Sequence, residues 1–146
     1  MMTDSALALP DVNVLIALTN PAHVFHTESH RWLATVERYA TTPITESGLF
    51  RLLLNPAVVG QRVTPRQALE VLTRIRADRR AAFLTDDSSL ARAGVDLTGL
   101  AGHKQVTDWH LLNLAAAHGG QLVTFDVKIV RALTPADAEH VLTLGK

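Results

Sequence analysis

The 146-residue sequence contains no cysteine, which excludes a disulfide framework, a thiolate zinc site and a cysteine nucleophile. It also lacks an apolar run approaching the roughly 18 or more residues of a membrane-spanning helix. The first residues, Met1 to Ser5, carry no basic side chain, and Pro10 and Asp11 interrupt the apolar stretch behind them, so a signal peptide is not expected. We therefore expect a cytoplasmic protein that does not enter a membrane.

An excess of either charge is absent as well. Fourteen Lys and Arg residues balance fourteen Asp and Glu residues, so the formal net charge is zero. This balance excludes a whole-surface attraction to nucleic acid or anionic lipid, and any such ligand has to be held by a local patch. Hydrophobic residues make up 47% of the chain and charged residues 19%, which excludes intrinsic disorder. The length predicts one domain spanning residues 1–146.

Short apolar runs alternate with longer segments of helical period, which is the pattern of an α/β fold around a mostly parallel sheet of four to five strands. Strands are expected at residues 7–10, 39–42, 82–84 and 121–125, with a fifth at 140–144. Helices are expected at residues 12–19, 27–39, 49–54, 64–77, 107–118 and 129–133. Thr107 is predicted to cap the helix that follows it, and Pro43 is predicted to break the chain after the second strand.

Four acidic residues stand at strand-to-helix turns or in the first turn of an expected helix: Asp11, Glu46, Asp108 and Asp126. In an open parallel sheet these ends lie together on one rim, where such sheets bind ligands. Carboxylates at close range repel one another, so an ionised cluster needs a cation, and Mg²⁺ or Mn²⁺ prefers oxygen ligands. The set therefore predicts a metal site, although each acid taken singly also fits helix capping.

Two polar residues accompany the first and last of these acids. Asn13 lies two residues after Asp11, and Thr124 lies two residues before Asp126. Both are placed to orient a carboxylate or a metal-bound water. Ordinary turn chemistry explains Asn13 equally well, and β-propensity explains Thr124.

Four short segments resemble, in order, the motifs of PIN domains: residues 9–15, 45–46, 106–108 and 122–126. The size and the segments at residues 30–33 and 45–53 are most similar to VapC toxins of bacterial toxin–antitoxin pairs. The resemblance covers nearly the whole chain. It implies a three-layer α/β/α fold, a Mg²⁺- or Mn²⁺-dependent endoribonuclease acting on RNA, a homodimer, and a VapB-type antitoxin whose C-terminal segment fills the active-site groove.

The resemblance also assigns roles to the residues: the acidic quartet to Asp11, Glu46, Asp108 and Asp126, and the supporting polar positions to Asn13 and Thr124. In this assignment the three aspartates hold the ion, and the glutamate is a further ligand or orients the water. Many family members carry another acid shortly after the last aspartate, where this chain has Val127 and Lys128. The number of metal ions therefore stays open.

RNA contacts are expected from a basic stretch between Arg62 and Arg80, where six arginines and two acids give a net charge of +4. Arg74 and Arg79 are the candidate contact residues within this stretch. The alternative is that the stretch is only a solvent-exposed helix face. Arg51 is a further candidate, and Trp109 is placed either to stack an unpaired base or to pack in the core.

Two other functions remain open at this stage. One is a PIN-like domain that binds RNA or protein without cutting it. The other is a receiver-like signalling domain, which is also near this length and also carries aspartates at the strand rim. Receivers use an acidic pair after the first strand, whereas Asp11 has no adjacent acid.

Overall fold

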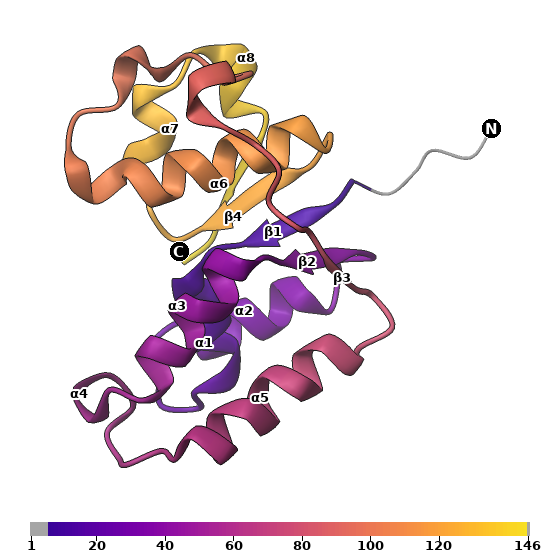
Figure 1. Cartoon of the computed structure of the whole chain (residues 1–146), viewed down its shortest axis with the longest axis vertical. Helices are drawn as coiled ribbons and strands as arrows, with labels where there is room; N and C mark the ends of the chain where they lie inside the picture. Colours follow the sequence, from indigo (N-terminus) through magenta and orange to yellow (C-terminus); the bar gives the residue numbers. More distant parts are fainter. Residues whose placement is uncertain (1–5, 146) are drawn as a thin grey trace.

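The computed structural model describes residues 6–145, and its centre is a five-stranded sheet in which every pair of neighbouring strands is parallel. In chain order the strands are β1 (Ala8–Pro10), β2 (Tyr39–Thr41), β3 (Ala81–Phe83), β4 (Gln121–Thr124) and β5 (Val141–Thr143). Their order across the sheet is β3-β2-β1-β4-β5 (Figure 1). The chain therefore passes from β1 to β2 on one side and returns as β4 on the other. Such a switch point opens a crevice at the carboxyl ends of the strands.

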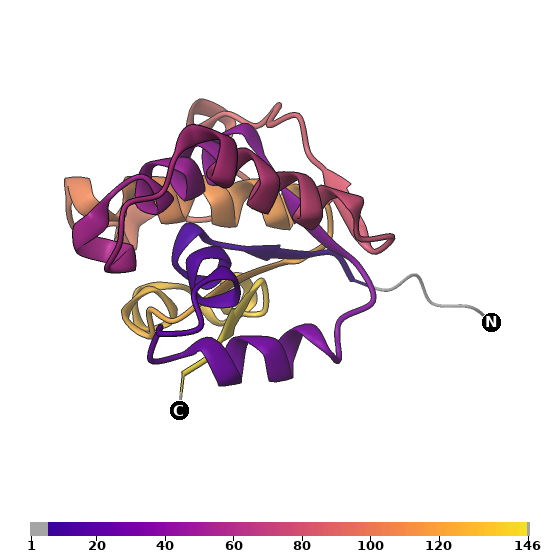
Figure 2. The same cartoon turned by 90° about the horizontal axis from the view of Figure 1, so that it is seen from below.

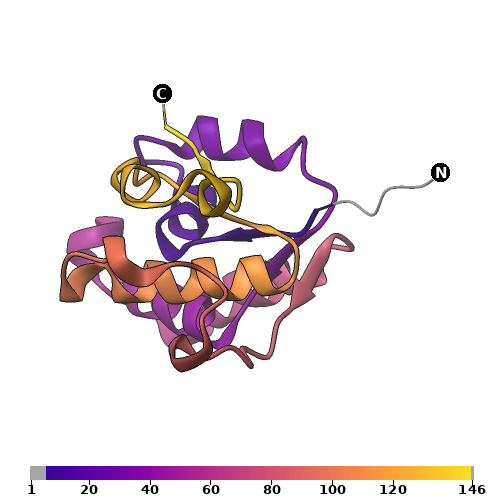
Figure 3. The same ribbon diagram turned by 90° about the horizontal axis from the view of Figure 1, so that it is seen from above.

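The helices are α1 (Val12–Thr19), α2 (His26–Leu33), α3 (Pro43–Leu53), α4 (Pro56–Val59), α5 (Pro65–Ala77), α6 (Val106–Ala117), α7 (Lys128–Ala132) and α8 (Pro135–Ala138). Three 3₁₀ turns, η1 (Leu90–Arg92), η2 (Leu97–Gly99) and η3 (His103–Gln105), connect β3 to α6. The sheet lies between α6 on one face and α2 on the other, which gives the predicted three layers (Figures 2 and 3). None of the helices within residues 6–145 is long and apolar enough to cross a membrane.

The two faces of the sheet bury different side chains, because successive residues of a strand point to opposite sides. Leu9 of β1 packs in one cluster with Trp109 of α6, and both are fully buried. Its neighbour Ala8 packs in a second cluster with Trp32 of α2. A third cluster joins α1, α3 and α5 to one another. This packing holds the carboxyl ends of β1 and β4 rigidly beside the start of α6.

All five predicted strands are confirmed, and α1 has the predicted bounds. The second helix is shorter than predicted and ends at Leu33 rather than at residue 39. Its end is fixed by Arg80, whose Nη1 donates to the carbonyl oxygens of Leu33 at 2.6 Å and Val36 at 3.1 Å. This contact joins residues 47 positions apart, so the local sequence could not predict it.

Two predicted helix starts were wrong. Pro43 does not break the chain but is the first residue of α3, whose N-cap Thr42 forms a capping box with Thr45. Thr107 does not cap α6, because η3 runs directly into that helix and the N-cap is Gln105, without a side-chain hydrogen bond. The short helices α4 and α8 were not predicted; each has a proline at its first position.

Candidate active site

Asp11 lies at the point where β1 gives way to α1. Its backbone N–H donates to the carbonyl oxygen of Val123 in β4 at 2.9 Å, and its Oδ1 accepts the N–H of Val14 at 2.9 Å as the N-cap of α1. The residue is only 3% exposed. The start of a helix is a favourable place for a carboxylate. The backbone therefore fixes a buried acid at the switch point of the sheet.

Thr124 connects Asp11 with Asp126. Its hydroxyl hydrogen-bonds the Asp11 carboxyl and partly offsets the burial that raises the pKa of that group. Its Oγ1 accepts the N–H of Asp126 at 3.1 Å. Asp126 in turn accepts the N–H of Lys128 with Oδ1 at 2.8 Å. The fully buried threonine thus orients both acids, in the position predicted for a supporting residue.

Three aspartates influence one another electrostatically. Burial is the largest cause that raises the pKa of Asp11, and the charge of Asp126 adds to it. Burial, followed by the charges of Asp11 and Asp126, raises the pKa of Asp108 to about 6. Asp108 reaches the other two from the first turn of α6. The structure therefore places acids from β1, α6 and the end of β4 in one electrostatic neighbourhood, without a Lys or Arg among the causes of these shifts.

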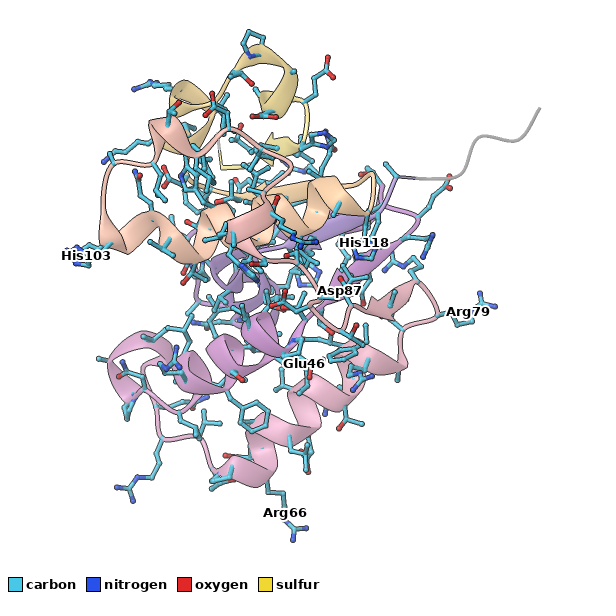
Figure 4. All side chains as sticks on the ribbon, turned by 45° about the horizontal axis from the view of Figure 1, so that its top comes forward. Glu46, Arg66, Arg79, Asp87, His103 and His118 are labelled. Atoms are coloured by element: carbon cyan, nitrogen blue, oxygen red, sulfur yellow. The ribbon has the colours of Figure 1, made fainter. Side chains whose placement is uncertain are left out.

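Glu46 lies beside this neighbourhood, at the carboxyl end of β2. It stands in the first turn of α3, and its Oε2 accepts the hydroxyl of Thr41 at 2.7 Å. The Nε of Arg76 lies 3.7 Å from the same oxygen. Figure 4 shows Glu46 near the centre of the molecule, whereas Arg66, Arg79 and His103 extend from its periphery. The Glu46 side chain is therefore largely screened from solvent, with 16% of it exposed.

The side chains do not form a closed coordination sphere as they stand. Within residues 6–145, no group of three or more His, Asp or Glu side chains is close enough to hold a metal ion. The donor set nevertheless fits a hard divalent cation, because it consists of carboxylates that burial and mutual repulsion make costly to ionise. A cation is the group that would remove that cost.

Asn13 contributes to the site differently from the prediction. Its side chain is exposed and makes no hydrogen bond in the described part of the chain. Its backbone N–H, at the start of α1, hydrogen-bonds the Asp11 carboxyl instead and offsets part of the rise in pKa that burial causes. The helix N-terminus, rather than the Asn13 amide, therefore supports the carboxylate.

The RNA-contact candidates have separate positions. Trp109 is fully buried in the core, so the interpretation that it stacks an unpaired base was wrong. Arg51, Arg74 and Arg79 are exposed, and Figure 4 shows Arg79 pointing away from Glu46. Arg76, which the prediction did not single out, is the arginine of the basic stretch that approaches Glu46.

Comparison with known proteins identifies the family. The chain matches the PIN domain over residues 8–133. Ribonuclease VapC39 of Mycobacterium tuberculosis is 43% identical over 126 residues, which cover 84% of this chain and 90% of that protein. Ribonuclease VapC38 of the same species is 41% identical over 144 residues, covering 93% of this chain and all of the relative.

A solved structure agrees with these matches in fold. The crystal structure of M. tuberculosis VapC20, described as a sarcin–ricin loop cleaving toxin, superposes with a TM-score of 0.56 at 15% identity, covering 78% of this chain and 85% of the other. The matches confirm the predicted family and exclude the receiver-like alternative. The chain belongs to the PIN-domain family and, within it, to the VapC ribonucleases.

Proposed function

We propose that this chain is a metal-dependent endoribonuclease toxin that hydrolyses phosphodiester bonds of RNA at the crevice between β1, β4 and α6. The observation that carries the proposal is the neighbourhood of Asp11, Asp108 and Asp126, three acids from distant segments at the switch point of the sheet. Burial and then the charge of Asp126 raise the pKa of Asp11, and burial and then the charges of Asp11 and Asp126 raise the pKa of Asp108. Relatives that share 37–43% of their residues with this chain are named ribonucleases. Both observations favour nucleic-acid hydrolysis over binding alone.

The carboxylates of Asp11, Asp108 and Asp126 would hold the metal ion, with Glu46 as a further ligand or as the group that orients the attacking water. We propose Mg²⁺ or Mn²⁺, because both prefer oxygen donors of this kind. A bound divalent ion lowers the pKa of water and stabilises the charge that builds on the phosphate. No serine or histidine nucleophile is then required.

The surrounding residues would keep these acids in place during the reaction. The N–H of Val14 and the hydroxyl of Thr124 fix Asp11, and Thr124 also fixes the backbone of Asp126. Glu46 accepts the Thr41 hydroxyl with Oε2, which leaves Oε1 to accept a proton from water or to bind the ion. Fixed ligands of this kind are what a metal-assisted hydrolysis needs from its protein.

The proposed partners follow from the same assignment. A VapB-type antitoxin would silence the enzyme by filling the crevice, and both proteins would act in the cytoplasm. A homodimer is supported by exposed large hydrophobic side chains on adjoining helices, Leu54 at 40%, Val58 at 38% and Leu69 at 56% exposure. Arg51, Arg74 and Arg79 are exposed cations, and we propose them as weaker RNA contacts outside the crevice.

The test is cleavage of RNA by the purified chain, followed by sequencing of the 5′ ends of the fragments. We expect cutting at defined positions with Mg²⁺ or Mn²⁺, no cutting in EDTA, and none by the Asp126→Asn variant. Asp87→Asn is the matched control, because Asp87 is 77% exposed, lies 3.8 Å from His118 (both labelled in Figure 4) and is not among the charges that raise the pKa of Asp11 or Asp108. Full cleavage in EDTA, or by Asp126→Asn, would contradict the proposed metal-dependent mechanism. Binding of RNA by the wild-type protein without any cleavage would instead leave a binding domain that does not cut.

A further inference from the structure

Arg76 stands at the end of α5 in a conformation held by an aromatic ring. Its guanidinium carbon lies 4.6 Å from the centroid of the Phe83 ring, and its Nε lies 3.7 Å from Oε2 of Glu46. Stacking on an aromatic face restrains the guanidinium plane while leaving its edge available. The Arg76 side chain is 51% exposed, whereas that of Glu46 is 16% exposed. The arginine is therefore both restrained and accessible from solvent.

Its position follows the edge of the sheet. Phe83 is the last residue of β3 and pairs in register with Thr41 of β2, the residue whose hydroxyl binds Glu46. Asp11 follows β1, the next strand along. Neighbouring strands are about 4.8 Å apart, so the backbones of β3 and β1 are separated by about two strand spacings, roughly 10 Å, along the rim. Arg76 therefore stands on the β3 side of the rim, next to Glu46, where it would meet a further phosphate of an RNA strand that runs along the strand ends.

The contact with Glu46 leaves the hydrogen-bond donors of the Arg76 guanidinium unoccupied. At 3.7 Å the Nε–Oε2 separation exceeds a hydrogen bond, and half-exposed ion pairs contribute little to stability. Neither terminal nitrogen of Arg76 makes a hydrogen bond within residues 6–145. Two parallel N–H donors in a fixed plane are the arrangement that binds a phosphate in a bidentate manner.

A neighbouring arginine shows the contrasting case. Arg80 donates to Asp78 at 2.9 Å and to the carbonyl oxygens of Leu33 and Val36, so its donors are already occupied inside the fold. Arg66 and Arg79 extend from opposite ends of the α5 region, away from Glu46 (Figure 4). Arg76 is thus the cation of this basic stretch whose place on the rim, rather than its charge alone, points to a ligand.

We propose that Arg76, held on Phe83, is a phosphate-binding residue that grips the RNA backbone beside the cleaved bond. On binding, its guanidinium would exchange the long contact with Glu46 for a phosphate, which releases the Glu46 carboxylate toward the crevice. This inference rests on the proposed function, because it assumes that the crevice receives RNA.

The experiment measures RNA binding without cleavage. A fluorescein-labelled single-stranded RNA is titrated with the Asp126→Asn protein, and anisotropy gives the dissociation constant at several salt concentrations. Adding Arg76→Gln is expected to weaken binding about tenfold and to reduce the slope of log Kd against log salt by about 0.7, the value for one phosphate contact on a single strand. Phe83→Leu is expected to cause a smaller loss. Arg31→Gln, an exposed arginine on α2 on the other face of the sheet, is expected to change neither quantity.

A second comparison separates phosphate binding from a merely structural contact. In a protein that also carries Glu46→Gln, Arg76→Gln should still weaken RNA binding, because the phosphate contact does not need the carboxylate. Loss of the effect in that background would overturn the proposal, as would unchanged affinity and salt slope in Arg76→Gln itself. If wild-type protein cleaves RNA and Arg76→Gln binds it normally, only this inference fails. If the wild-type protein neither cuts nor binds RNA, the proposed function fails with it.

Discussion

Replacing Asp108 with asparagine tests how costly it is to ionise this carboxyl in the metal-free protein, first through its burial and then through repulsion by Asp11 and Asp126. Burial and the charges of Asp11 and Asp126 raise the pKa of Asp108 from its ordinary 3.8 to about 6. Between these two values the folded protein binds more protons than the unfolded chain, so the free energy of unfolding falls as the pH rises. Below about pH 4 the carboxyl is protonated in both states and the penalty is absent. Above about pH 6 the penalty is complete.

The size of the penalty follows from the shift. A displacement of about two pH units corresponds to roughly 3 kcal/mol at 1.36 kcal/mol per unit. Asp108 is only partly buried, so solvent screening reduces this figure, and we expect about 1–2 kcal/mol. Asparagine has nearly the same shape and carries no charge. Asp108→Asn should therefore stabilise the metal-free protein at pH 7 by about 1–2 kcal/mol, or about 3–6 °C in melting temperature.

The assay is denaturant unfolding in EDTA at intervals between pH 4 and pH 8, for wild type, Asp108→Asn and the exposed control Asp87→Asn. The gain of Asp108→Asn over wild type should vanish near pH 4 and be complete near pH 7. Adding Mg²⁺ at pH 7 should stabilise wild type more than Asp108→Asn, because binding to the folded state alone raises stability. A variant that is no more stable than wild type at pH 7, or a gain that does not depend on pH, would refute the reasoning.

Three further outcomes are expected, each checked by denaturant unfolding. Asparagine at position 11 still caps α1, whereas alanine does not. The Asp11→Asn variant should therefore be about 1 kcal/mol more stable than Asp11→Ala, and equal stabilities would show that the cap contributes nothing. Gly48→Ala should cost about 1–3 kcal/mol, because its new Cβ would lie 2.5 Å from Cγ2 of Val12 where α3 crosses α1; a neutral result would mean that the helices separate freely. Trp109→Ala should cost about 3–5 kcal/mol, because the ring is fully buried, whereas a change in RNA binding with full stability would restore the stacking interpretation.

The sheet was predictable because its signals are local. Each strand is an apolar run that a polar turn or a helix start ends, and Asp11 is recognisable as a cap from its place between β1 and α1. The rim positions of Asp108 and Asp126 followed from the rule that ligand sites of parallel sheets lie at strand ends. The position of Thr124 could also be predicted from the sequence, since it lies only two residues from Asp126.

The features of the site that could not be predicted depend on packing between distant segments of the chain. Arg76 reaches Glu46 across 30 positions of the chain, and only the placement of α5 against α3 and β3 brings the two together. Trp109 could not be assigned from α6 alone, because that helix is buried on several sides and carries no clear polar face near the residue. The contribution of the Asn13 backbone to Asp11 depends on the helix start and not on the side chain, so the residue type at this position did not indicate it.

The most direct test of the acidic site is a crystal structure of the wild-type protein with Mn²⁺, located by its anomalous scattering. We expect a peak bound by carboxylate oxygens of Asp11, Asp108 and Asp126 near the ends of β1 and β4, with Glu46 adjacent, and no peak there in Asp126→Asn. A Mn²⁺ ion bound elsewhere, or an unchanged peak in Asp126→Asn, would contradict it.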